Sequence, residues 1–215
     1  MHSVLRTTAL GFIGLCAASV APASAASIAY PNAGTQNPAK YSFVANGGDI
    51  TGYYLGTGAA YNETLGLLVN GLAVASDVFQ NHTTDVGSSY NFGSFAKGSI
   101  LTFFIDVATT GATFYSDKSL NLDGSQHIYS SAYAGSGTTP AGTYVGFEDL
   151  SSKRSLYPSQ GYNVDYNYTD EQFAFTNLSV SSVPLPAAAP MFGAALLALG
   201  AVGYGLRRKK AATAA

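Results

Sequence analysis

Apolar residues alternate with polar ones over short stretches of the chain, and Gly, Asn, Ser and Pro separate these stretches. Alternation with a period of two is typical of a β-strand that buries one face, and Tyr, Phe, Val, Ile and Thr favour this conformation. The period of 3.6 that is typical of an amphipathic helix is nearly absent from the middle of the chain. The pattern therefore predicts these strands: 40–45, 50–55, 64–69, 99–107, 112–115, 126–133, 143–147 and 172–180.

Two of these stretches indicate how the strands are arranged. SILTFFIDV carries apolar residues on both faces, which predicts a central strand that is covered on at least part of each face. In QFAFTNLSV, Phe173 and Phe175 have one parity and Leu178 and Val180 have the other, so the strand needs a bulge or bend near Asn177. Many such strands with few charges predict an all-β fold, an antiparallel β-sandwich of jelly-roll-like type.

The two ends of the chain differ from this middle part. Residues 1–26 have a weakly positive start, an apolar core and small residues before the end, which predicts a signal peptide with a helical core that signal peptidase removes. Residues 187–206 form an uncharged stretch long enough to cross a ~30 Å hydrocarbon layer as a transmembrane helix. A basic cluster follows at once: Arg207, Arg208, Lys209 and Lys210.

The basic cluster sets the expected topology. By the positive-inside rule it stays in the cytoplasm, and the residues before the predicted helix lie outside the inner membrane. We therefore expect three parts: a signal peptide at 1–26, a β-sandwich ectodomain at 27–182 and a C-terminal tail at 183–215.

The expected ectodomain is acidic. It contains all twelve acidic residues of the sequence against five basic ones, which gives it a formal charge of −7, whereas the whole chain has −2. An acidic surface repels phosphate backbones and attracts divalent cations, so we expect no nucleic-acid partner. The one cysteine, Cys16, lies in the predicted signal peptide, which leaves the mature domain without a disulfide or a thiolate metal site.

Catalytic motifs are absent from the sequence. It contains no G-x-S-x-G elbow and no H-E-x-x-H, and nothing in the spacing of its glutamates selects the carboxylate pair of a glycosidase. We therefore expect a protein that is not an enzyme and that has no organic cofactor.

Acidic and amide side chains gather late in the domain. Glu148 and Asp149 lie near the end of GTYVGFEDL, and the segment NVDYNYTDEQFAF adds Asp165, Asn167 and Asp170. Because calcium takes six to eight oxygen ligands in flexible geometry, these five residues are candidate calcium ligands. The segment lacks the glycine and the last glutamate of an EF-hand. The alternative is that these Asp and Asn residues form Asx-turns without an ion.

The tail resembles a known sorting signal. Its motif is Val183, Pro184, Leu185, Pro186 and Ala187, and an apolar stretch and the basic cluster follow. This order is similar to the VPLPA variant of the PEP-CTERM tail, which occurs on exported proteins of Gram-negative bacteria. The resemblance implies processing by an exosortase, with a transient stay in the inner membrane before the protein reaches the cell surface or the medium. An ordinary single-pass anchor is the alternative.

The domain also resembles PEP-CTERM ectodomains in two segments. VGFEDL with DYNYTDEQFAF is similar to a pattern near the end of these ectodomains, and GAAYNETLGLLVNG is similar to their early segment. The resemblance implies that Glu148, Asp149, Asp165 and Asn167 stand at positions suspected of binding calcium.

Three classes of function remain open. We favour a non-catalytic cell-surface or extracellular-matrix protein that is associated with exopolysaccharide or a biofilm. The second class is a carbohydrate-binding module, for which Tyr157, Tyr162 and Tyr166 are the candidate contacts with a sugar or a partner, because they lie in a stretch with turn residues. A secreted enzyme is the third.

Overall fold

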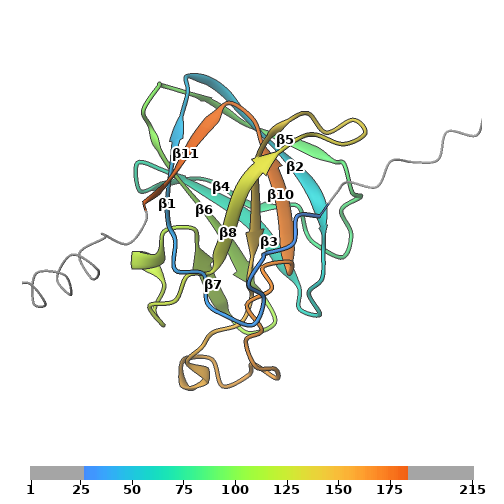
Figure 1. The fold of residues 1–215 in the computed structure, drawn as a ribbon, viewed down its shortest axis with the longest axis vertical. Coiled ribbons are helices and arrows are strands. Elements are labelled where there is room, and N and C mark those ends of the chain that lie inside the picture. Colours follow the sequence, from blue (N-terminus) through green and yellow to red (C-terminus); the bar gives the residue numbers. More distant parts are fainter. Residues whose placement is uncertain (1–26, 184–215) are drawn as a thin grey trace, which may run out of the picture.

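The computed structural model describes residues 27–183, which fold into two antiparallel sheets packed face to face (Figure 1). The first sheet contains β1 (Lys40–Ala45), β3 (Glu63–Val69), β4 (Leu72–Val78), β6 (Ile100–Val107), β7 (Ala112–Tyr115) and β11 (Leu178–Val183). The second contains β2 (Gly48–Thr57), β5 (Ser89–Phe95), β8 (Ile128–Tyr133), β9 (Gly142–Phe147) and β10 (Glu171–Phe175). Two short 3-10 helices, η1 (Lys118–Leu120) and η2 (Arg154–Leu156), lie in the connections.

The strand order brings distant parts of the chain together. It is β11-β1-β6-β3-β4 in the first sheet, with β7 paired to β6, and β5-β2-β10-β9-β8 in the second. Neighbours such as β2 and β10 are far apart in sequence, because the chain crosses between the sheets several times. The all-β fold with two antiparallel layers, predicted from the alternation, is confirmed.

The last stretch of the predicted pattern consists of two strands in different sheets. β10 pairs with β2 and β9, whereas β11 pairs with β1. Asn177 lies between them with φ 63°, and its Nδ2 donates to the carbonyl oxygens of Gly47 at 2.7 Å and Asp49 at 3.1 Å. The predicted bend near Asn177 is thus a corner between the sheets, which lets Phe175 and Leu178 both pack into the core.

Aromatic rings from both sheets fill the core. Phe103 of β6 stacks on Phe175 of β10 with 4.0 Å between the ring centroids, and it meets Phe43 of β1 edge-on at 5.5 Å. All three rings are buried. Because the sequence contains no tryptophan, phenylalanine and tyrosine provide the large apolar surfaces and the ring–ring contacts that hold the layers together.

The sequence pattern did not predict β4 and β5, and each of these strands lies at the edge of its sheet. β4 is the last strand in the order of the first sheet, and β5 is the first in that of the second. Leu72 and Val74 of β4 are exposed, and Phe92 is the one buried residue of β5. An edge strand that buries little shows little alternation, so the sequence predicted too few strands.

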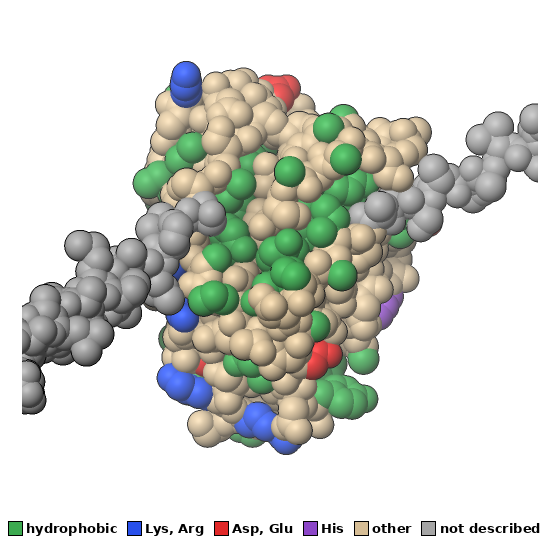
Figure 2. Space-filling view, viewed as in Figure 1, with side chains coloured by type: hydrophobic (Ala, Val, Ile, Leu, Met, Phe, Trp, Pro, Cys, Tyr) green, Lys and Arg blue, Asp and Glu red, His purple; other side chains and the backbone are tan. Residues whose placement is uncertain are grey.

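Figure 2 shows a face made mainly of uncharged side chains, with charged side chains towards its margins. Within the described part of the chain, no helix has the length and apolar character needed to cross a membrane. The predicted signal helix and the tail beyond Val183, with the rest of its motif, its helix and its basic cluster, lie outside the described residues and stay predictions.

Candidate metal site

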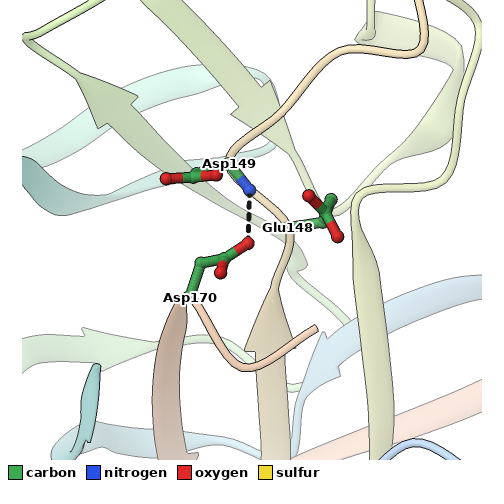
Figure 3. Close-up of side chains that lie close together, drawn as sticks. All are labelled: Glu148, Asp149 and Asp170. Carbon is green, nitrogen blue, oxygen red and sulfur yellow. Dashed lines mark hydrogen bonds between the residues drawn. The ribbon is translucent and has the colours of Figure 1, made fainter. Parts of the chain in front are cut away.

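The candidate metal site lies where one strand of the second sheet ends and its neighbour begins. β9 and β10 are antiparallel and pair Phe147 with Glu171. Glu148 and Asp149 follow β9 and Asp170 precedes β10, so the pairing brings these three acids together (Figure 3). Each has a carboxylate oxygen within 4.8 Å of one from each of the others. The backbone N–H of Asp149 also donates to Oδ2 of Asp170 at 3.0 Å.

A glycine in β9 allows the chain to pass close to this site. A Cβ at Gly146 would lie 2.2 Å from the carbonyl oxygen of Tyr168, which is too close for any side chain. The hydroxyl of Tyr168 accepts a hydrogen bond from the backbone N–H of Asn37 at 2.8 Å and donates to the carbonyl of Gln126 at 3.2 Å. These contacts anchor the chain shortly before Asp170.

Two further glutamates point into the same end of the sandwich. Glu171 has the parity of Phe173 in β10, and Phe173 belongs to the core between the sheets. Glu63 is the first residue of β3 in the opposite sheet and has the parity of Leu65, which is also a core residue. Both side chains therefore face the interior from opposite layers.

All five carboxylates are buried without a basic partner. Their relative exposures are 0 % for Glu148 and Glu171, 1 % for Glu63, 5 % for Asp149 and 8 % for Asp170. Within residues 27–183 the one ion pair joins His127 and Asp123, so no lysine or arginine there lies within salt-bridge distance of the five acids. The six carboxyl oxygens of the three glutamates accept no hydrogen bond from the described residues.

An ionised carboxylate that is buried without a partner is strongly disfavoured, so each of these groups must keep its proton or bind a cation. Burial raises the pKa of Glu148 to about 10, and the nearby charges of Asp170 and Asp165 add to the rise. Burial also raises the pKa of Glu63 to about 12, with Asp149 as its main neighbour. Burial is also the main cause that raises the pKa values of Asp149, Asp170 and Glu171. A bound cation would favour the ionised forms instead.

Asp165 and Asn167 lie in the loop before β10, where each forms an Asx-turn. Oδ1 of Asp165 accepts from the backbone N–H of Asn167 at 3.0 Å, and Oδ1 of Asn167 accepts from the backbone N–H of Thr169 at 2.7 Å. The Asx-turn alternative therefore describes the local geometry. Asp165 is exposed and acts electrostatically on Glu148, whereas the amide oxygen of Asn167 is engaged by Thr169.

A cleft of about 330 Å³ connects two of the five buried acids with solvent. Its lining includes Asp149, Asp170, Asp165, Tyr61 and Tyr162. An ion can therefore reach two of the buried carboxylates from outside. A slightly larger hollow of about 360 Å³ lies elsewhere, and its lining includes two lysines and one acid rather than an acidic cluster.

The three tyrosines predicted to contact a ligand differ in accessibility. Tyr162 borders the cleft, is 61 % exposed and has its ring centroid 6.0 Å from that of Tyr61. Tyr157 is buried against Phe114, and Tyr166 is half-buried. Tyr162 is therefore the one of the three with most of its surface open to a sugar or a partner.

A buried polar network supports the segment that carries the acids. Nδ1 of His127 donates to the carbonyl oxygen of Glu148 at 2.9 Å, and Nε2 lies 3.1 Å from Oδ2 of Asp123. The hydroxyl of Ser151 donates to Asp123 at 3.0 Å rather than to the histidine. This arrangement lacks the serine–histidine contact of a nucleophilic triad, and it fixes the backbone at Glu148.

Glu63 and Glu171 are the two members of the cluster that were not among the five predicted ligands, and Glu63 comes from a different part of the sequence. It opens the stretch ETLGLLV on the same parity as Leu65 and Leu67. An acid at an inward position of an otherwise apolar strand is unusual, and this is the signal that could have found it.

Comparison with models of protein families found no match, and comparisons with curated proteins and with solved structures found none either. The function is therefore argued from the five buried acids and their surroundings.

Proposed function

We propose that the domain is a non-catalytic, calcium-binding β-sandwich, jelly-roll-like in type, of an exported surface or matrix protein. One observation carries the calcium part of the proposal: five carboxylates are buried together at one end of the sandwich, and no lysine or arginine of the described chain compensates them. A structure built in this way gains stability from a divalent cation, because the cation replaces the protons that the acids otherwise keep.

The donor set favours calcium over other ions. Every side chain of the cluster offers oxygen, and calcium accepts six to eight oxygens at flexible geometry. Magnesium demands a tighter octahedron and releases its waters reluctantly. Zinc favours nitrogen and sulfur donors, but both ring nitrogens of His127, the histidine beside the cluster, already contact Glu148 and Asp123.

Thermal melting of the chain with EDTA, calcium or magnesium tests this proposal. Calcium at about 100 times its Kd stabilises the folded state by roughly 2.7 kcal/mol, which raises Tm by several degrees. We expect a smaller shift with magnesium. Asp149→Ala should abolish the calcium-dependent shift, Asp165→Ala should reduce it, and Asp85→Ala, which removes an exposed acid away from the cluster, should preserve it. Equal Tm values in EDTA and in millimolar calcium would refute calcium binding.

The exported location rests on the two ends of the sequence. The signal-like residues 1–26, the motif from Val183 to Ala187 and the basic cluster support export by signal peptidase and sorting by an exosortase, with exopolysaccharide as the proposed neighbour of the mature protein. We expect the protein recovered from its cells to have lost both ends. Mass spectrometry of the mature termini checks this, and a chain that still ends at Ala215 while exosortase is active would favour a plain membrane anchor.

A carbohydrate-binding module is the second candidate, and Tyr162 is the specific observation in its favour. The ring is exposed beside the cleft, where it offers a stacking platform for a sugar. The buried Tyr157 contributes to the core instead, which leaves this candidate with fewer contacts than the sequence predicted.

A further inference from the structure

Two of the five buried acids form a central pair, and the other three lie on two sides of it. Figure 3 shows Glu148 and Asp149 directed to opposite sides of the backbone, as expected for consecutive residues of an extended chain. Asp170 lies next to both, and its Oδ2 accepts the backbone N–H of Asp149. Asp149 and Asp170 thus form the centre of the cluster, and the other acids extend from it in two directions.

The inner direction leads into the space between the sheets. Glu171 faces that space from β10 and Glu63 faces it from β3, on the parities of Phe173 and Leu65. Asp149, Asp170 and Glu171 are the charged groups that act on Glu63, and Asp149 and Asp170 are those that act on Glu171. The inner acids therefore share the central pair as their neighbours.

The outer direction leads through Glu148 towards Asp165, in the loop before β10. The charges of Asp170, Asp165 and Asp149 act on Glu148. Asp165 lines the cleft and is exposed. The central pair is therefore a neighbour of Glu148 on one side and of the two inner glutamates on the other.

One ion does not account for these groups. A cation held by Glu148, Asp149 and Asp170 leaves the four carboxyl oxygens of Glu63 and Glu171 without a partner, although both glutamates are at least 99 % buried. If all five buried acids were ionised, one divalent cation would leave three negative charges and two would leave one. If Glu63 and Glu171 stayed protonated beside one ion, their four buried oxygens would still accept no hydrogen bond, and a second cation supplies the partner they lack.

We propose that the cluster binds two calcium ions, which share Asp149 and Asp170: Glu63 and Glu171 complete the inner position, and Glu148 and Asp165 complete the outer one. This inference rests on the proposed calcium-binding function and adds the second ion and its two glutamates. The inner ion joins the sheets directly, because its ligands come from β3 in one layer and from β10 in the other. It therefore acts as a cross-link at the open end of the sandwich.

Calcium stoichiometry tests the two-ion site. The full chain is purified in detergent, freed of metal with a chelator and titrated with calcium by calorimetry, and bound metal is counted by mass spectrometry. We expect two ions per chain for the unmodified protein, one for Glu63→Gln and one for Glu148→Gln. Asp85→Asn is the matched control and should keep two. The glutamine variants conserve volume, and circular dichroism confirms that they fold.

The outcomes separate this inference from the proposed function. No bound calcium refutes both. One ion in the unmodified chain supports a calcium-binding domain and overturns the second position. Two calcium ions bound to the Glu63→Gln variant would overturn the assignment of Glu63 to the inner position.

Lanthanide luminescence gives a test that needs no variant. Terbium replaces calcium at oxygen sites and is excited through nearby tyrosines, and Tyr61 lines the cleft beside the cluster. When terbium and europium are loaded together, two ions on one chain should shorten the terbium lifetime by energy transfer. A terbium lifetime that europium does not change would overturn the two-ion site.

Discussion

Phe103→Ala is expected to lower the free energy of unfolding by about 3 to 5 kcal/mol, a large part of the stability of a domain of this size. The ring is fully buried and lies between the sheets, stacked on Phe175 at 4.0 Å and against Phe43 at 5.5 Å. Its removal deletes the ring–ring contacts and leaves a cavity that the strands can close in part only. Urea denaturation followed by tyrosine fluorescence measures the change.

Ile100→Ala is the matched control for this prediction, because Ile100 lies in the same strand and is 54 % exposed. Truncation of a side chain that is half in solvent should change the stability by well under 1 kcal/mol. A loss of less than about 1 kcal/mol for Phe103→Ala would contradict the packing of the two sheets through this ring.

The sequence predicted the strands in which buried and exposed residues alternate, and it did not predict the strands that bury few residues. The bounds of β1 and β7 agree with the prediction, and β6 differs by one residue at its start. β4 and β5 were missed because edge strands need few apolar residues. The prediction of one bent strand near Asn177 was half right, because parity revealed the bend but not that the chain changes sheets there.

The candidate site was also predicted from the sequence in part only. Glu148, Asp149 and Asp170 flank two stretches that the sequence identifies as strands, so their approach follows once these strands pair. Glu63 joins them from the other sheet, and a contact between residues so distant in sequence depends on how the two layers pack. Local patterns carry no information about such a contact, although an acid with the inward parity of Glu63 is a signal that could have pointed to the need for a partner.

The stability of the metal-free protein is expected to fall as the pH rises from about 5.5 to 8.5. In the folded state the pKa of Glu148 is raised from 4.5 to about 10, and that of Glu63 is raised further, because burial disfavours their charged forms. The unfolded chain releases these protons near pH 4.5. The stabilisation is therefore complete below that pH and is lost as the pH rises towards the folded-state values, by about 1.4 kcal/mol per pH unit for each proton retained.

Calcium should remove this pH dependence. Once an ion takes the place of the protons, the folded and unfolded states bind similar numbers of protons, so stability no longer falls with pH. The calcium-dependent rise in Tm should consequently be larger at pH 8.5 than at pH 5.5. Melting curves at three pH values, with chelator-treated protein and with excess calcium, measure both slopes. Glu148→Gln, which cannot titrate at that position, should make the metal-free slope less steep, because the other buried acids still titrate, whereas Asp85→Ala should leave the slope unchanged. A metal-free Tm that rises with pH across this range would contradict the protonated, buried cluster, because raised pKa values permit a change in one direction alone.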